Sequence, residues 1–165
     1  MTHDVIILGS TGSIGRTTLR SISKNKKFKI SLLSANKNAN KLLKQCIEYK
    51  VKNSIINDEK NYFFYKKIFK KNNVKLHLGF SNINSILKKK ASFCINSISG
   101  INGLEPTLKI IPHTKKILIA NKESIICAWH IISRKLKKYN TKFIPIDSEH
   151  FSIWKLIKNE NLYNI

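Results

Sequence analysis

Acidic residues, arginines and long apolar runs are all scarce in this chain of 165 residues. No stretch reaches the roughly 18 consecutive apolar residues that a membrane-spanning helix needs, so we expect no membrane segment. The apolar run at residues 5–8 begins too close to Met1 to leave room for a signal or transit peptide. We therefore predict a cytoplasmic protein.

The chain has few cysteines. Cys46, Cys94 and Cys127 are odd in number and widely spaced, and no two of them form a Cys-x-x-Cys pair. This pattern indicates neither a disulfide framework nor a zinc site. We expect all three to be reduced, buried thiols.

The 9 acidic residues face 31 basic ones, which gives a formal net charge of +22. Clustered basic residues bind nucleic acids by neutralising phosphates. However, only Arg16, Arg20 and Arg134 are arginines, the side chain preferred for bidentate recognition of phosphate and guanine. The lysines are spread along the chain among many Asn and Ile residues, so we predict a solvated surface that attracts anionic ligands and no specific nucleic-acid partner.

Short apolar runs alternate with amphipathic stretches from end to end, which is typical of an α/β domain with parallel strands joined by helices. We expect strands near residues 4–9, 28–34, 53–57, 74–78, 92–98, 116–120 and 142–146. Apolar side chains at three- and four-residue spacing predict helices at residues 14–24, 39–50, 60–71, 82–90, 103–111 and 123–138. A last helix is expected after Ser148.

A glycine-rich segment, GSTGSIG at residues 9–15, joins the first strand directly to the first helix. Gly9 permits a tight turn, Gly12 lets the backbone approach a pyrophosphate, and Gly15 allows the helix to pack closely. The free N–H groups at the helix start would face the anion. The spacing differs from the commoner G-x-G-x-x-G, and a merely structural turn is the alternative. The order of strand, loop and helix favours dinucleotide binding by a Rossmann-like, doubly wound, mainly parallel sheet with helices on both faces.

The end of the second strand indicates which dinucleotide is bound. An NAD site is expected to place a carboxylate there for the ribose 2′-hydroxyl, whereas this sequence reads Ser-Ala-Asn-Lys-Asn at residues 34–38. A 2′-phosphate is attracted by Lys37 and meets no carboxylate in this segment. We therefore predict NADPH rather than NADH. The alternative is that Lys37 is one more surface lysine.

Two further polar segments lie at the ends of later strands, ANKES at residues 120–124 and PIDSEH at 145–150. Asp147 and Glu149 are two residues apart, so in an extended backbone their carboxylates project to the same side, as ligands of Mg²⁺ or Mn²⁺. The same residues also fit a helix start with Ser148 as its cap. Lys122 is suited to neutralise a substrate oxyanion or phosphate, although an isolated lysine is usually solvated.

Four motifs occur together in a distinctive order: GSTGSIG at 9–15, GLEPTL at 103–108, ANKES at 120–124 and PIDSEH at 145–150. In this combination the chain resembles the 1-deoxy-D-xylulose 5-phosphate reductoisomerase family. The resemblance covers essentially the whole chain but less than half of the family's usual length. It implies an NADPH- and divalent-metal-dependent rearrangement and reduction of 1-deoxy-D-xylulose 5-phosphate to 2-C-methyl-D-erythritol 4-phosphate, in isoprenoid precursor synthesis.

The resemblance also implies roles for individual residues. Those expected to bind NADPH are Thr11, Gly12, Ser13 and Ile14 at the pyrophosphate, Asn36, Lys37 and Asn38 at the adenosine phosphate end, and Asn121 and Glu123 near the reacting carbon. Those expected at the phosphorylated sugar are Lys122, Ser148 and Glu149, of which Lys122 and Glu149 are the expected catalytic residues. Asp147 and Glu149 are the expected metal ligands, and the metal acts as a Lewis acid on the substrate oxygens.

The resemblance divides the chain into an NADPH-binding domain at residues 1–146 and the start of the metal- and substrate-binding region at 147–165. Two departures stand out. Asn36 occupies a position where the family usually has glycine. Asn tolerates a positive φ better than most residues, so we expect the loop to form but with weaker cofactor affinity. The family's third metal carboxylate, substrate-phosphate site and closing loop lie beyond Ile165, so we expect a fragment that is inactive alone, of a family expected to form homodimers.

Other classes of protein remain alternatives. A semialdehyde or homoserine dehydrogenase has a similar glycine loop but does not explain ANKES and DSEH together. A non-catalytic NADPH-binding module, or a basic nucleic-acid-binding module, is the other possibility. DNA binding driven by phosphate contacts would weaken steeply with salt, which distinguishes the last of these from a cofactor-binding domain.

Overall fold

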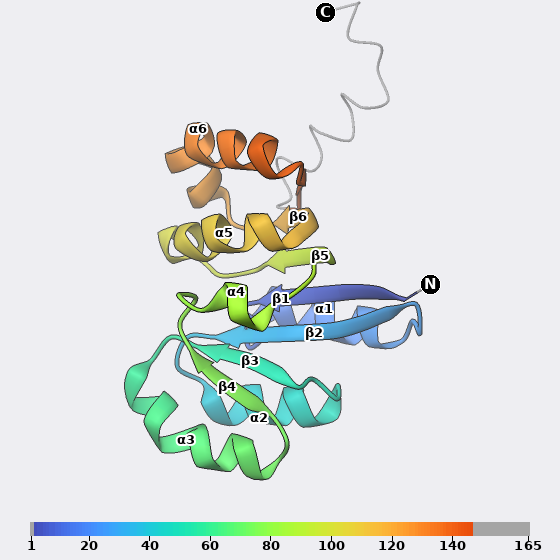
Figure 1. Cartoon of the computed structure of the whole chain (residues 1–165), viewed down its shortest axis with the longest axis vertical. Coiled ribbons are helices and arrows are strands. Elements are labelled where there is room, and N and C mark those ends of the chain that lie inside the picture. The colour runs from blue at the N-terminus through green and yellow to red at the C-terminus, as the bar shows by residue number, and fades with distance from the viewer. Residues whose placement is uncertain (1, 147–165) are drawn as a thin grey trace, which may run out of the picture.

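A seven-stranded parallel sheet forms the centre of the protein, as the computed structural model shows for residues 2–146, the part of the chain that it describes (Figure 1). The strands are β1 His3–Leu8, β2 Phe28–Ala35, β3 Asn53–Ile56, β4 Lys75–Leu78, β5 Ala91–Asn96, β6 Thr114–Ile119 and β7 Lys142–Pro145. Their order in the sheet is β4-β3-β2-β1-β5-β6-β7. The sheet therefore grows outward in one direction from β1 and in the other from β5, which confirms the predicted doubly wound fold.

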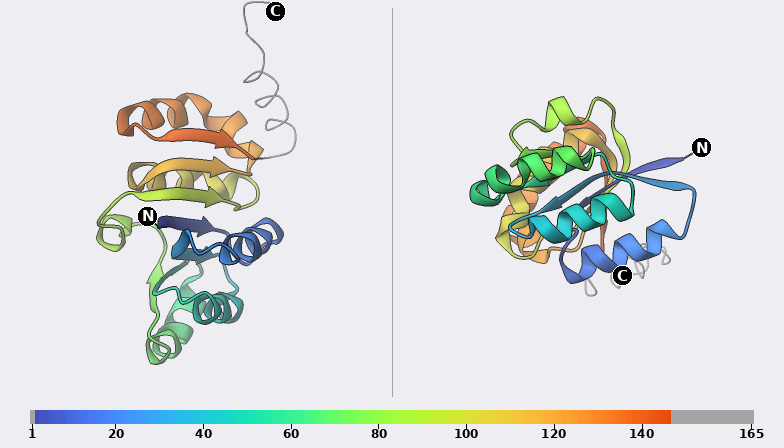
Figure 2. Two further views of the ribbon diagram at one scale, coloured as in Figure 1. Left: turned by 90° about the vertical axis from the view of Figure 1, so that its right-hand side faces the viewer. Right: turned by 90° about the horizontal axis from the view of Figure 1, so that it is seen from below.

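The helices lie on both faces of this sheet (Figure 2). They are α1 Ser13–Ser23, α2 Ala39–Glu48, α3 Glu59–Lys71, α4 Ile83–Ile86, α5 Leu104–Ile110 and α6 Lys122–Tyr139, with short 3₁₀ turns η1 Ile101–Gly103 and η2 Ile111–His113. The first three cover one face, and the last three cover the other. The helix expected at 82–90 is shorter than predicted, because α4 ends after Ile86 and the three consecutive lysines at 88–90 lead into β5.

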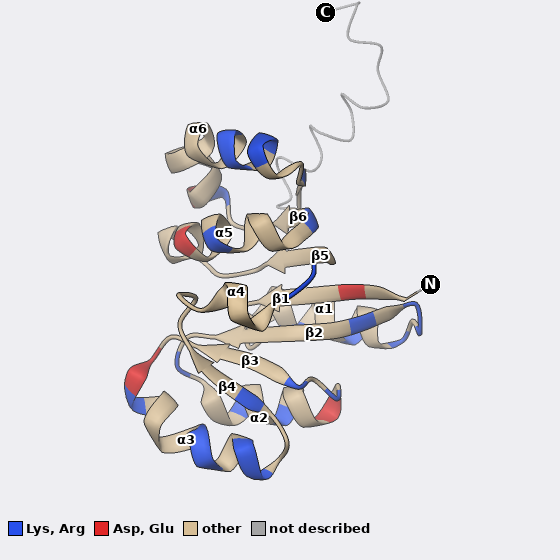
Figure 3. Ribbon diagram, viewed as in Figure 1, with Lys and Arg blue, Asp and Glu red and all other residues tan. Residues whose placement is uncertain are grey.

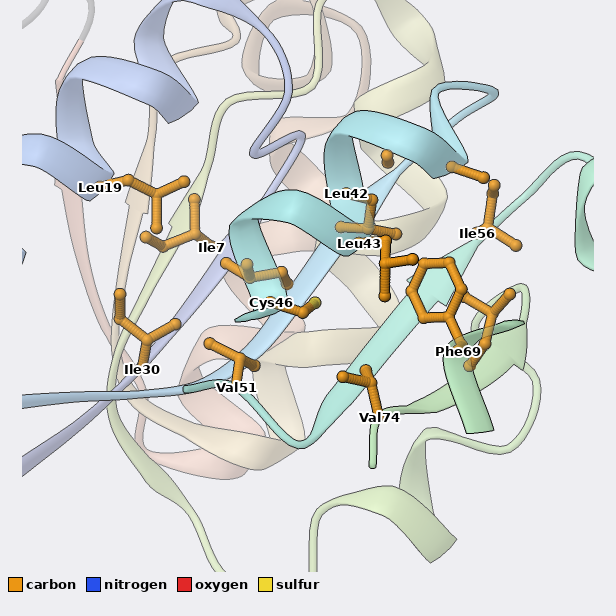
Figure 4. Close-up of a cluster of buried hydrophobic side chains, with 14 of the residues drawn as sticks. Ile7, Leu19, Ile30, Leu42, Leu43, Cys46, Val51, Ile56, Phe69 and Val74 are labelled. Atoms are coloured by element: carbon orange, nitrogen blue, oxygen red, sulfur yellow. The ribbon is translucent and has the colours of Figure 1, made fainter. Parts of the chain in front are cut away.

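The strands are apolar on both faces because helices cover both. In β1, Val5 and Ile7 face the layer of α1 to α3, while Ile6 and Leu8 face the layer of α4 to α6. Figure 4 shows the first of these cores, where Leu42 of α2 and other side chains from α1 to α3 meet the sheet. Fully buried parallel strands are expected to read as continuous apolar runs, as β1 does.

One prediction about the cysteines is wrong. Cys46 and Cys94 are buried, and burial raises the pKa of the Cys46 thiol to about 12 and also raises that of Cys94. Cys127 is exposed. The buried positions of α6 recur every four residues at Ser124, Ala128, Ile132 and Leu136, so Cys127 lies off the buried face.

The basic residues are distributed over many elements. Figure 3 shows Lys and Arg on α2, α3, α5 and α6 and on β2, with few acidic residues among them. No helix within residues 2–146 is long and apolar enough to cross a bilayer.

The core between α3 and the sheet provides a test of the fold. Phe69 is 0% exposed, whereas Phe64 on the same helix is 70% exposed. We expect Phe69→Ala to lower the free energy of unfolding by about 3–5 kcal/mol through lost burial and a cavity, and Phe64→Ala to change it little. Urea unfolding followed by circular dichroism measures both. Equal losses in the two variants would contradict the packing described.

Candidate functional site

The glycine loop turns sharply where β1 ends. Gly9 has a φ of +74°, a conformation that side chains rarely adopt, and a Cβ there would lie 2.9 Å from the carbonyl carbon of Ser97. The N–H of Gly12 donates to the carbonyl oxygen of Gly9 at 3.1 Å, which closes the turn. Gly12 is the N-cap of α1 and provides no side-chain cap, so the first N–H groups of the helix are available to an anion.

The third glycine brings α1 against this turn. A Cβ on Gly15 would overlap the carbonyl oxygen of Gly9 and lie 2.6 Å from the Cα of Ser10. A Cβ on Gly12 would meet one atom within 4 Å, the Gly9 oxygen at 3.4 Å. Gly15 is therefore required for helix packing, while Gly12 keeps the outer side of the loop open, as the sequence predicts for both.

A buried polar network holds the loop from beneath. The hydroxyl of Ser10 donates to Oε1 of Gln45 at 2.8 Å, and Nε2 of Gln45 donates back to the Ser10 carbonyl at 2.9 Å. The N–H of Gly9 donates to the Ser34 hydroxyl at 3.1 Å. This network fixes the loop to α2 and β2. Sequence reasoning missed it, although a glutamine among the apolar positions of the helix was the available signal.

A cleft of about 520 Å³ opens at the carboxyl edge of the sheet, beside the glycine loop. Its walls come from the loop, from the ends of β2, β3 and β5, and from η1 and α5, with Thr11, Gly12 and Asn36 among the lining residues. Open α/β sheets bind ligands at this edge, next to the point where strand order reverses. Here that point lies between β1 and β5.

A second hollow of about 340 Å³ adjoins the first, and residues 97–99 line both. Ile14, Asn121, Lys122 and Glu123 line it, together with Ile146 at the end of the described chain. The structure thus brings the start of α1 and the ANKES segment to one hollow. Lys122 and Glu123 are exposed there.

Residues 97–99 form the wall between the two hollows, and two buried asparagines, Asn121 and Asn96, hold this wall. The amide of Asn121 donates to the carbonyl oxygens of Ile98, at 2.6 Å, and of Gly100, while its oxygen caps α6 by accepting from the N–H of Ser124 at 2.7 Å. Asn121 is 3% exposed, and its side-chain hydrogen bonds hold the wall in place.

Asn96, at the end of β5, holds the same wall from below. Its amide nitrogen donates to the carbonyl of Gly103 at 3.0 Å and to the hydroxyl of Thr107 at 2.7 Å, and its oxygen accepts from the N–H of Ile98 at 3.1 Å. Sequence reasoning missed this residue as well. Its side chain connects the strand to the GLEPTL segment.

The residues expected at the adenosine phosphate end, Asn36, Lys37 and Asn38, follow β2 in the sequence, and all three are exposed. Asn36 lines the first cleft, and Asn38 caps α2 by accepting from the N–H of Lys41 at 3.1 Å. Among residues 2–146, the non-glycine positions with positive φ are Lys50, Asn73 and Asn140, so Asn36 takes an ordinary backbone conformation. The structure gives no backbone reason for a glycine at position 36.

A carboxylate that the sequence analysis did not consider lies near Lys37. Asp58 follows β3 and caps α3, and hydrogen bonds from the N–H and side chain of Asn61 lower its pKa, with further lowering from the charges of Lys37 and Lys60. Asp58 thus lies near Lys37, and its carboxylate is already engaged as a helix cap.

The predicted metal ligands lie outside the described residues. Asp147, Ser148 and Glu149 all follow Ile146, where the description ends. Within residues 2–146 no group of three or more His, Cys, Asp or Glu side chains is placed to hold a metal ion. Of the other expected site residues, Ser13 lines an apolar groove beside α1.

The loop geometry predicts different outcomes for two glycine substitutions. We expect Gly15→Ala to lower the free energy of unfolding by about 1–3 kcal/mol, because the new methyl group overlaps backbone. Gly12→Ala serves as the matched control and should cost about 1 kcal/mol or less, as an alanine at an N-cap position does. Thermal unfolding of both variants measures the difference, and a Gly15→Ala protein as stable as the parent would refute the close approach.

The chain matches known proteins over most of its length. Residues 5–129 match the family model described as 1-deoxy-D-xylulose 5-phosphate reductoisomerase. The enzyme of that name from Pelagibacter ubique is 48% identical over 163 residues, which are 97% of this chain and 42% of the relative. One from Wolbachia pipientis of Culex pipiens is 37% identical, covering 95% of this chain and 41% of the relative.

Solved structures of reductoisomerases have the same fold as this chain. The Zymomonas mobilis reductoisomerase in complex with NADPH superimposes with a TM-score of 0.84 at 29% identity, over 94% of this chain and 41% of that one. A DOX-P reductoisomerase in complex with NADPH, fosmidomycin and magnesium gives 0.83 at 29% identity, over 93% and 38%. The chain spans about two fifths of the length of these relatives. The family model, the relatives and the solved structures all agree, and the chain belongs to the 1-deoxy-D-xylulose 5-phosphate reductoisomerase family.

Proposed function

We propose that residues 1–146 form the NADPH-binding domain of a reductoisomerase that converts 1-deoxy-D-xylulose 5-phosphate to 2-C-methyl-D-erythritol 4-phosphate. The observation that carries the proposal is the uncapped start of α1 at the edge of the 520 Å³ cleft, with Thr11 and Gly12 in the lining. A helix start of this kind is an anion site made of backbone N–H groups. The NADPH bound by the similar Zymomonas mobilis enzyme supports the assignment.

In this proposal the cofactor follows the two adjoining hollows. Its pyrophosphate lies against residues 11–14, and its adenosine phosphate end reaches residues 36–38, where Lys37 supplies a positive charge. Its nicotinamide end enters the second hollow, where Asn121 and Glu123 position it near the reacting carbon. The lining of both hollows by residues 97–99 supports one continuous ligand track.

We assign the metal and the sugar phosphate to residues next to the second hollow. Asp147 and Glu149 provide the hard oxygen ligands that suit Mg²⁺ or Mn²⁺, and magnesium is present in similar solved structures. Such an ion supplies Lewis-acid polarisation of substrate oxygens. Lys122 and Ser148 would contact the substrate, and Lys122 and Glu149 are the proposed catalytic residues. Lys122 lines the hollow, which supports its part in this assignment.

The remaining assignments rest on the sequence and the resemblance. Residues 147–165 are proposed to begin the metal- and substrate-binding region. A cytoplasmic location and a homodimer of the full-length protein are expectations of the same kind. The alternative function is a non-catalytic NADPH-binding module.

The cofactor preference is directly testable. We expect the chain to bind NADPH more tightly than NADH, and Lys37→Ala to reduce that preference by about 5-fold, or about 1 kcal/mol for one exposed charge contact. Lys44→Ala, which removes an exposed lysine of α2 outside the cleft lining, is the matched control and should leave the ratio unchanged. Fluorescence titration at fixed salt measures both affinities. Equal affinities of the parent for the two cofactors would refute the assignment.

The second test concerns turnover by this chain alone. We expect it to bind NADPH without oxidising it in the presence of 1-deoxy-D-xylulose 5-phosphate and Mn²⁺. Two carboxylates leave a divalent ion mostly hydrated, and the family's closing loop and phosphate contacts lie outside this sequence. NADPH absorbance follows the reaction, with an Asp147→Asn, Glu149→Gln double variant as the control. Substrate-dependent oxidation that disappears in the double variant would show that the chain is a sufficient enzyme.

A further inference from the structure

The helix α3 presents large apolar side chains to solvent. Phe63 is 64% exposed, Phe64 is 70% exposed and Ile68 is 38% exposed, whereas Phe69 on the same helix is fully buried. Single exposed apolar residues are common on protein surfaces, but several large ones gathered on one helix are typical of an interaction surface. The outer side of α3 therefore has an apolar component that packing on the sheet does not use.

Lysines share this outer side. Residues spaced by three and four positions lie on one side of a helix, and from Lys60 onward this spacing selects only lysines and apolar residues. We call this set the aromatic-basic face, and its members, all exposed, are Lys60, Phe63, Phe64, Lys67, Ile68 and Lys71. The helix has five lysines and one acidic residue, Glu59 in its first turn. The face thus combines apolar side chains with positive charge.

Two half-buried tyrosines hold the exposed phenylalanines. The ring of Phe63 meets Tyr62 edge-on at a centroid distance of 5.3 Å, and the ring of Phe64 meets Tyr65 in the same way at 5.0 Å. Both tyrosines also pack against the core beneath α3. These contacts restrict the phenylalanine rings before a partner arrives, which lowers the entropy cost of burying them.

The aromatic-basic face lies away from the proposed cofactor site. The helix α3 runs beside β4, the strand at one edge of the sheet (Figure 1). No residue of α3 is among those that line the two hollows. A partner on this face leaves the hollows open, so its binding does not depend on the proposed function.

The charge and side-chain types of the face distinguish its possible occupants. A second copy would bring two sets of lysines together, which like charge opposes. Surfaces that stack nucleic-acid bases use aromatic rings along a basic groove, often with arginine, whereas α3 is a single helix without arginine, and Ile68 has no ring to stack. An anionic bilayer accommodates both components, because lysines meet its phosphates and apolar side chains enter the acyl boundary.

We propose that the aromatic-basic face of α3 docks on the surface of a bilayer that contains anionic phospholipids. Phe63, Phe64 and Ile68 enter the boundary between headgroups and acyl chains, while the three lysines of the face contact lipid phosphates. The helix then lies in the plane of the bilayer surface. This contact is peripheral, and it is compatible with the finding that no helix within residues 2–146 is long and apolar enough to cross a bilayer.

Sedimentation of the 165-residue chain with lipid vesicles tests the apolar part of the face. We expect the chain to bind vesicles of phosphatidylcholine mixed with phosphatidylglycerol, and to bind vesicles of phosphatidylcholine alone several-fold more weakly. Phe64→Ala should weaken binding to the mixed vesicles several-fold, with circular dichroism confirming that the variant is folded. Ile126→Ala is the matched control, because Ile126 on α6 is also 70% exposed, and it should leave binding unchanged. Unaltered binding of the Phe64→Ala protein would overturn the proposal.

A second pair of variants tests the charge. Lys67→Gln should weaken binding to the mixed vesicles by about 5-fold, as expected for one lysine next to an anionic surface. Lys137→Gln removes the same charge from an exposed position on α6 and should have little effect. Equal losses in the two variants would show that net charge alone drives binding, and would overturn docking through α3.

The other partners give different results. Fluorescence anisotropy with a labelled single-stranded oligonucleotide tests nucleic acid, and a loss of oligonucleotide binding in Phe64→Ala without a loss of vesicle binding would overturn the proposal. So would a parent chain that fails to sediment with the mixed vesicles. NADPH titration of the Phe64→Ala protein should match the parent, which separates failure of this proposal from failure of the cofactor assignment.

Discussion

The close approach of α1 to the turn after β1 is the constraint on which the site depends. Gly15 packs against Gly9 and Ser10 at a distance that no side chain permits, and this contact sets where the helix begins. The start of α1 then lies at the edge of the cleft, beside residues that follow β2 and β5. The anion site is thus a consequence of backbone packing, since no charged side chain is needed to form it.

Buried polar side chains turn this local geometry into a fixed cavity. Gln45 and Ser34 hold the loop from below, while Asn96 and Asn121 hold the wall between the two hollows. Each of these side chains bonds to main-chain atoms of another segment of the chain. A buried polar group that is left without a hydrogen-bond partner lowers the stability of the fold. These groups therefore keep the cleft open in one shape, which a site assembled from loops requires.

The doubly wound topology explains both the position of the site and the apolar groove. Because helices leave β1 toward one face and β5 toward the other, the polar cleft forms where the strand order reverses. The same division leaves the α1 side of β5 to β7 without a helix within residues 2–146. Because the strands of a parallel sheet are usually covered on both faces, this side of β5 to β7 is an apolar surface that the described helices leave open.

The sequence by itself determined the α/β class, all seven strands and the three glycine roles, because strand periodicity and the absence of a Cβ are local properties. It also indicated the family through four motifs. Only the tertiary structure showed that Gln45 and Asn96 support the site, that Asp58 lies near Lys37, that Cys127 is exposed and that Asn36 needs no positive φ. These facts depend on which segments meet across the sheet and on how each helix is rotated, and residue spacing along the chain does not specify either.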